Sequence, residues 1–300
     1  MGNIVLTDSN IEMLKYLASL RVMTEKQISA LFYSKIDSLT FDTAKARCYV
    51  SNRLSQLAGA GFVSKVPIPS ASRITRQGYV LGPKGALALK HHLEIENMHT
   101  ANWLERKHTD VVVHYRHLIY TNNFLINLIL LSRLIPGFQL DEWIPDSDCI
   151  FYIKRGEKPQ ILDPDLYLAT SNGNGSSCTS FVEMDCGTLT SRVLKRKVLR
   201  FFQYYESRKY RLDLGYPLFP RVAVIVPDAN RVSSFSKAIR QVKENYAGKK
   251  SESLKKMPFF LSDFSSADIN SIEEGRISRK PLEPIWVDEN GRKRNSPLVK

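Results

Sequence analysis

The chain has 300 residues, which is enough for two ordinary domains. Its hydrophobic fraction of 43% and charged fraction of 24% are typical of a globular protein and exclude an intrinsically disordered one. The net charge of +13 predicts a polyanionic partner, either a nucleic acid or a membrane surface, so the distribution of this charge along the chain decides between them.

The cysteine pattern and the N-terminus predict a cytoplasmic protein. The cysteines lack the CxxC or Cys/His spacing of a metal site, and we expect reduced thiols. They are Cys48, Cys149, Cys178 and Cys186. Residues 1–8 lack the basic start and long apolar run of a signal peptide. The longest apolar stretch, residues 124–131, is too short to span a bilayer, so no membrane partner is expected.

Residues 1–90 predict a winged helix-turn-helix domain. Apolar residues recur at helical spacing over residues 9–20, with Asp8 or Ser9 as N-cap. Thr24 and Gln27 form a capping-box pattern that opens a short second helix ending near Phe32. The third helix is expected to start near Asp42 or Thr43 and to end near Gly59 or Gly61.

The third helix has the two faces that a DNA-recognition helix needs. Val50, Leu54 and Leu57 follow i, i+4, i+7 spacing and are expected to pack inward. The opposite face, which is predicted to meet base edges, carries Lys45, Cys48, Asn52, Ser55 and Gln56. Arg47 and Arg53 lie on the flanks, where they would reach phosphates.

A basic hairpin is predicted directly after this helix. Residues 62–67 and 78–82 read as two short strands, and the loop between them carries Arg73 and Arg76 without any acid. A hairpin with a basic tip after a recognition helix is typical of a wing that contacts the DNA backbone. We therefore expect double-stranded DNA as the partner, with a small helical domain for protein contact as the alternative.

A polar linker over residues 91–103 and a second domain over residues 104–290 follow. The second domain is predicted to be α/β (α+β) with a central mixed sheet, because strands and helices alternate after a long first helix. The expected helices are 104–131, 190–210 and 232–242, and the expected strands besides the acidic pair are 138–144, 149–154, 221–226, 258–261 and 285–287. Residues 291–300 read as an irregular basic tail.

Two acidic strands in the second domain are the strongest indication of chemistry. Because side chains alternate along a strand, Asp163 and Asp165 would share one face of the first strand, and Glu183 and Asp185 one face of the second. The Gly/Asn/Ser-rich segment 171–177 suits a hairpin turn that would bring these carboxylates together. Carboxylate clusters bind Mg²⁺, which indicates phosphodiester chemistry beside a basic helix.

Lys197 is the candidate catalytic lysine on that helix. The buried stripe runs through Leu194, Val198 and Phe201, and Lys197 lies about 60° from Leu194 at the edge of the stripe. It is therefore expected to reach under the helix towards the acidic strands. Neighbouring arginines point away from the stripe, towards solvent or a phosphate backbone.

The segments D-P-D-L-Y-L and E-M-D-C-G-T, with Lys197 downstream and Y-V-L-G-P-K-G-A upstream, resemble the replication-relaxation family of bacterial plasmids, phages and integrative elements. The likeness extends from about Asn10 to Trp286. It implies a winged helix joined to a domain similar to the PD-(D/E)XK nucleases, or restriction endonucleases. It also implies that Asp165, Glu183 and Lys197 are catalytic and that Asp165 and Glu183 hold Mg²⁺, with Asp185 either a third metal ligand or the residue that disables the site. Asp185 stands where the nuclease pattern has lysine, and Lys197 matches a lysine moved to the next helix.

Two functions remain open from the sequence. The first is a DNA-binding regulator or replication accessory protein of a mobile element, whose second domain has lost its chemistry and serves in homodimer or replication-partner contact. The second is an active Mg²⁺-dependent endonuclease or nickase. Activity in the second case would depend on Asp165, Glu183 and Lys197.

Overall fold

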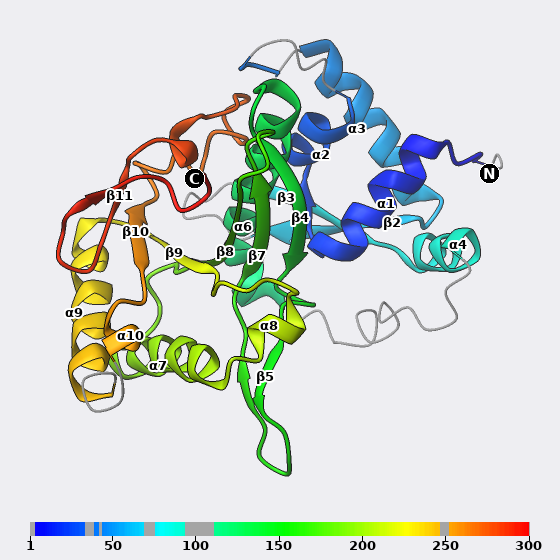
Figure 1. Cartoon of the computed structure of the whole chain (residues 1–300). Coiled ribbons are helices and arrows are strands. Elements are labelled where there is room, and N and C mark those ends of the chain that lie inside the picture. Colours follow the sequence, from blue (N-terminus) through cyan, green and yellow to red (C-terminus); the bar gives the residue numbers. More distant parts are fainter. Residues whose placement is uncertain are drawn as a thin grey trace. The chain divides into compact units, whose positions relative to one another are not determined.

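A computed structural model describes residues 4–33, 39–41, 44–68, 76–93, 111–246 and 252–299. The chain divides into two compact units (Figure 1). Unit 1 comprises Met1–Leu130 with Asn270–Ile277, and unit 2 comprises Leu131–Ile269 with Ser278–Lys300. The predicted linker at residues 91–103 lies outside the described residues from residue 94 onward, and the division between the units falls inside a later helix.

Unit 1 has the order of elements predicted for a winged helix. Its elements are α1 (Asp8–Leu20), β1 (Met23–Thr24), α2 (Glu25–Phe32), α3 (Ala44–Gly59), β2 (Val63–Ile68), β3 (Arg76–Leu81), α4 (Pro83–Leu93) and the first part of α6 (Val111–Leu134). β2 and β3 form an antiparallel hairpin, and β1 pairs with β3, giving the sheet order β1-β3-β2. The two-residue strand β1 is too short to leave a periodic pattern in the sequence.

The first two helices of unit 1 begin at threonine caps. Thr24 is the N-cap of α2 and forms the predicted capping box with Gln27. The predicted N-cap of α1 is wrong, because Thr7, and not Asp8 or Ser9, caps that helix through a capping box with Asn10. Thr7 has the extended backbone that an N-cap requires, whereas Asp8 already occupies the first helical position.

The core of unit 1 extends beyond the first ninety residues. Val22, which precedes β1, and Val66, Ile68 and Val80 of the three-stranded sheet pack against α6 residues Tyr115, Leu118 and Ile119. Buried amides fix the register of this contact: Gln27 Nε2 donates to Asn123 Oδ1 at 2.6 Å, and Asn122 Nδ2 donates to the Val22 carbonyl at 2.7 Å. The predicted helix 104–131 is therefore a structural part of unit 1 over residues 111–130, and residues 104–110 lie outside the described part of the chain.

A segment from late in the sequence completes unit 1. Residues 270–277 pair with the connection between α2 and α3: the Phe41 amide donates to the Gly275 carbonyl at 3.1 Å, and the Ile277 amide donates to the Leu39 carbonyl at 2.7 Å. Thr24 Oγ1 donates to Glu273 Oε1 at 2.6 Å. These bonds hold residues on both sides of the short helix α2.

Unit 2 is a mixed sheet covered by helices. Its elements are β4 (Gln139–Pro145), β5 (Phe151–Lys154), β6 (Gln160–Leu162), β7 (Leu166–Ser171), β8 (Ser177–Met184), α7 (Ser191–Ser207), α8 (Tyr210–Asp213), β9 (Arg221–Val226), α9 (Ala229–Asn245), α10 (Glu252–Lys255), β10 (Phe259–Asp263), β11 (Trp286–Val287) and β12 (Lys293–Arg294). The seven-stranded sheet has the order β12-β11-β10-β9-β8-β7-β4, with β8, β9 and β10 parallel. The predicted α+β class and central mixed sheet are confirmed.

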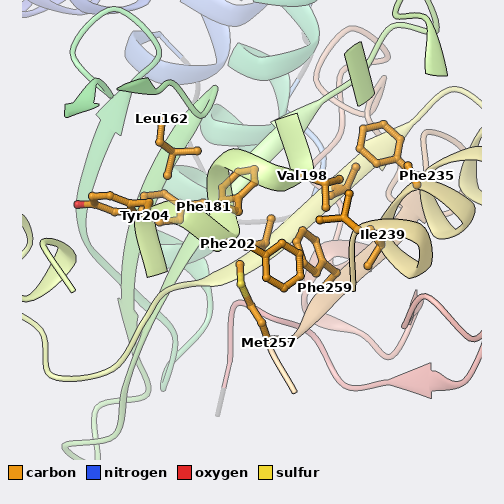
Figure 2. Close-up of a cluster of buried hydrophobic side chains, with 14 of the residues drawn as sticks. Leu162, Phe181, Val198, Phe202, Tyr204, Phe235, Ile239, Met257 and Phe259 are labelled. Atoms are coloured by element: carbon orange, nitrogen blue, oxygen red, sulfur yellow. The ribbon is translucent and has the colours of Figure 1, made fainter. Parts of the chain in front are cut away.

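One face of this sheet packs against α7 and α9. Figure 2 shows Phe202 of α7 and Ile239 of α9 close to Phe259 of β10, and the rings of Phe202 and Phe259 lie 5.8 Å apart. Tyr167 of β7 and Phe181 of β8 belong to the same buried cluster. Because side chains alternate along strands, other odd-numbered positions of β7 and β8, and positions directly beyond their ends, face the same helices.

The C-terminal tail differs from its prediction. Lys293–Arg294 form the edge strand β12, which pairs with β11. The following residues bind the sheet, where Thr170 Oγ1 donates to the Leu298 carbonyl at 2.6 Å and Ser180 Oγ donates to the Pro297 carbonyl at 2.8 Å. The tail is ordered because these hydroxyls give its backbone carbonyls buried partners, a tertiary effect that composition does not record.

Among the helices of the described part of the chain, none is long and apolar enough to cross a bilayer.

Candidate functional site

Asp165 and Glu183 lie opposite each other at one end of the sheet. Leu166 of β7 pairs with Val182 of β8, and the Asp165 amide donates to the Val182 carbonyl at 3.1 Å. This antiparallel register sets Asp165 across from Glu183 on the face that α7 covers. Both side chains are buried, and Asp165 Oδ2 accepts a hydrogen bond from the Met184 amide at 2.6 Å. The two carboxyl groups therefore share a site that is largely shielded from solvent.

Asp163 does not join this pair, contrary to the prediction that it shares a strand face with Asp165. The strand β7 begins at Leu166, and Asp163 is exposed, where it accepts a hydrogen bond from Arg200 at 3.0 Å. Pro164 separates the two acids and has no amide to donate to a sheet, so regular pairing starts only after it.

Lys197 reaches the carboxylates from α7. Its Nζ lies 2.5 Å from Glu183 Oε2, and its side chain is 25% exposed. Leu194, Val198 and Phe201 are buried on the same helix. The amphipathic spacing that placed Lys197 at the edge of the stripe therefore also brings it to the acidic hairpin.

The electrostatics of this group follow from its burial. Burial raises the pKa of Glu183 to about 8, although Lys197 lowers it, and the nearby Asp165 raises it further. For Lys197, burial lowers the pKa, but the attraction of Glu183 and Asp165 outweighs this effect, and its pKa is raised. Lys197 therefore stays protonated at neutral pH and places a positive charge beside Asp165 and Glu183.

Asp185 forms an ion pair with Arg231 and not with Lys197. Arg231 Nε donates to Asp185 Oδ2, and the Gly187 amide donates to Asp185 Oδ1 at 3.2 Å. Arg231 also donates through Nη2 to the Leu189 carbonyl at 2.8 Å. The side chain of Asp185 is only 3% exposed, so Arg231 compensates a buried charge.

Arg231 was not predicted from the sequence, although one feature could have indicated it. β8 and β9 are parallel neighbours, so the segments that leave their carboxyl ends lie at the same edge of the sheet. Asp185 directly follows β8, and Arg231 lies in the first turn of α9, the helix that follows β9. A basic residue at that point is within reach of an acid at the end of β8.

The candidate DNA-binding residues of unit 1 are only partly described. Val50, Leu54 and Leu57 are buried, and Cys48, Asn52, Ser55 and Gln56 are exposed, as their helical spacing predicts. Arg53 is half-buried and bonds to Gln56 Oε1, to Asn10 and to the Val5 carbonyl, so it braces α3 against the start of α1. The side chains of Lys45, Arg47 and Arg76, and the whole of Arg73, lie outside the described residues.

Comparison with models of known protein families shows which family this chain belongs to. The family model described as replication-relaxation matches residues 14–217, which is more than half of the chain. The chain belongs to the replication-relaxation family. Searches among curated proteins and among solved structures gave no match. Membership indicates a role in replication or in the biology of mobile genetic elements.

The matched region of this replication-relaxation protein contains Asp165, Glu183, Asp185 and Lys197 and ends before Arg231. The resemblance seen in the sequence was expected to reach Trp286. The partner of Asp185 therefore comes from outside the segment that defines the family.

The residues of this replication-relaxation protein fit Mg²⁺ as a pair of carboxylates. Mg²⁺ is commonly held by one or two carboxylates together with water and substrate phosphate, which suits Asp165 and Glu183. In the described part of the chain, no group of three histidine, cysteine or acidic side chains is arranged to hold a metal ion. Asp185 fits the role of a ligand less well, because both of its oxygens already accept hydrogen bonds.

Proposed function

We propose that this replication-relaxation protein binds double-stranded DNA through unit 1 and cleaves one of its strands through the Asp165–Glu183–Lys197 site of unit 2. The observation that carries the cleavage proposal is the 2.5 Å contact between Lys197 Nζ and Glu183 Oε2, opposite Asp165. It brings a P-D element, a second acid and a lysine to one place, although the lysine comes from a helix and not from the strand.

Binding to DNA is supported by three features of unit 1 and of the whole chain. Helices α2 and α3 are followed by a β-hairpin, and the outward face of α3 exposes Asn52 and Gln56, whose amides suit base edges. Residues 69–76 between and at the start of the hairpin strands include Arg73 and Arg76 and no acid, and the net charge of the chain is +13. The proposed partner is therefore duplex DNA of a plasmid, phage or integrative element.

The chemistry of the site follows from the charges of its residues. When bound, Mg²⁺ would offset charge on the scissile phosphate and lower the pKa of a water molecule. Asp165 and Glu183 would hold the ion through their carboxylate oxygens. Lys197, whose pKa is raised, serves as a cation that stabilises charge on the phosphate oxygens and does not act as a base.

The test is incubation of the pure protein with supercoiled plasmid that carries its own gene neighbourhood, in Mg²⁺, Mn²⁺ or EDTA. The proposal expects nicked plasmid with either metal and none with EDTA. Binding to the same DNA is measured in parallel by filter retention. Binding without nicking in either metal would contradict the proposed cleavage, whereas the proposed binding to DNA would be retained.

A specific observation favours a second candidate, a DNA-binding regulator or accessory protein without catalysis. The nuclease pattern has lysine at the position of Asp185, and here that acid is neutralised by Arg231. Such a protein would use unit 2 for contact with a second copy of the chain or with a replication or mobilisation protein. Binding without nicking is the result that this candidate predicts.

A further inference from the structure

The strands β5 and β6 form a ribbon that stands apart from the main sheet of unit 2. Within the described residues they pair with each other, antiparallel, and the seven-stranded sheet does not include them. Figure 1 shows the ribbon, labelled β5, extending away from the sheet. An isolated two-stranded ribbon is marginally stable in water, so something else must hold it.

The base of the ribbon is anchored on the helix that carries Lys197. Phe151 is buried, with its ring 5.4 Å from the rings of both Phe181 and Tyr204. Lys209 Nζ donates to the Ile153 carbonyl at 3.0 Å and to the Tyr152 carbonyl at 3.2 Å. These contacts fix the direction in which the ribbon extends from the rest of unit 2, because they hold the backbone of the ribbon as well as its side chains.

The far end of the ribbon is polar and basic. Lys154, Arg155 and Lys158 are all exposed, and Glu157 is the single acid of the turn. Arg155 lies over the ring of Tyr152, with its Cζ 5.1 Å from the ring centroid, which presents a cation and an aromatic ring together.

The ribbon also leads directly to the carboxylate site. β6 ends at Leu162, and Asp165 follows three residues later. The helix α7 packs against the base of the ribbon, and its first turns carry exposed Arg192 and Arg196. The candidate site thus lies between two basic elements of the same unit.

We propose that the β5–β6 ribbon is a DNA-binding arm that lies in a groove of the duplex beside the phosphate to be cleaved. A two-stranded ribbon fits the major groove of B-DNA, and the cations at its end suit the phosphates along the rim. From Phe151 to the turn at Gly156 the arm spans five residue steps, or about 17 Å at roughly 3.3 Å per residue. This inference rests on the proposed function, because it assigns the substrate contact of the same site.

The test compares two triple variants of the full chain. The arm variant is Lys154→Ala, Arg155→Ala and Lys158→Ala. The control variant, Lys237→Ala, Lys256→Ala and Lys293→Ala, removes the same charge from exposed positions elsewhere in unit 2. Affinity for duplex DNA is measured over a range of salt concentrations, with thermal unfolding to verify that each variant folds like the wild type.

The arm variant is expected to reduce the slope of log affinity against log salt by about 2 to 3, since each lost phosphate contact reduces it by about 0.9. It should also lose hydroxyl-radical protection on one stretch of backbone, while the control variant keeps both the slope and the footprint. An unchanged slope in the arm variant, or an equal reduction in both variants, would overturn the assignment. A wild-type chain that binds no duplex DNA would instead overturn the proposed function, and the arm with it.

Discussion

Protonation of Glu183 links the stability of unit 2 to pH. Its pKa is raised to about 8 by burial, whereas the unfolded chain releases this proton near pH 4.5. Between these values the folded state binds more protons than the unfolded state, so this group makes unfolding easier as pH rises. The stabilisation is fully present below about pH 4.5 and is lost by about pH 8.

This linkage predicts the behaviour of Glu183→Gln, which cannot ionise at this position. Relative to the variant, the wild-type free energy of unfolding should decrease from pH 5 to pH 8 and change little above that. Urea unfolding of both proteins at several pH values measures the difference. A difference that stays constant over this range would show that Glu183 is ionised throughout.

The charge of Lys197 is predicted to be needed for cleavage and not for binding. Lys197→Met removes the cation that faces Glu183, and nicking should decrease by about 100-fold or more, as when an electrostatic donor to a transition state is removed. Lys197→Arg retains the charge and should recover part of the rate. Equal nicking by the wild type and the methionine variant would exclude Lys197 from the chemistry.

At the scale of elements, the contact of Asp185 with Arg231 joins the end of β8 to the first turn of α9. Asp185 is 3% exposed and Arg231 is 16% exposed, so removing one partner leaves a buried charge unpaired. Arg231→Met is expected to lower the free energy of unfolding by about 3 to 5 kcal/mol. The double variant Arg231→Met, Asp185→Asn should lose much less, since no charge is then left unpaired.

Urea unfolding of the two single variants and the double variant gives the coupling energy directly. A double variant that loses as much as the sum of the single variants would show that the two residues act independently. Nicking by Asp185→Asn is a second measurement. The variant should still cleave if Asp185 has only a structural role, and it should lose cleavage if Asp185 is a metal ligand.

The sequence predicts elements with strong local patterns and misses those that depend on distant partners. The stripe of Leu194, Val198 and Phe201 places Lys197 correctly at the edge of α7, because helical spacing alone determines that position. The pairing of Asp185 with Arg231 was missed because the two residues are brought together by a parallel strand pair and not by local spacing. The order of the tail around Leu298 depends likewise on hydroxyls of β7 and β8.

At the scale of the whole molecule, unit 1 depends on residues beyond 1–90, the range over which the sequence predicts a winged helix. Tyr115, Leu118 and Ile119 of α6 pack against apolar residues of the three-stranded sheet. Asn122 donates to the Val22 carbonyl, and Asn123 accepts from the side chain of Gln27. A fragment of residues 1–90 should therefore unfold at a lower temperature by circular dichroism than a fragment of residues 1–134, although both fragments lack residues 270–277 of the unit. Equal melting temperatures for the two fragments would contradict the assignment of α6 to unit 1.

The most direct test of cleavage compares Asp165→Asn with Asp163→Asn in the nicking of supercoiled plasmid. The two acids lie on either side of Pro164, but Asp165 is buried opposite Glu183, whereas Asp163 is exposed beside Arg200. Both variants should bind duplex DNA with wild-type affinity. Metal-dependent nicking that is lost in Asp165→Asn and kept in Asp163→Asn is the predicted result. Nicking that survives in Asp165→Asn would contradict the proposed site.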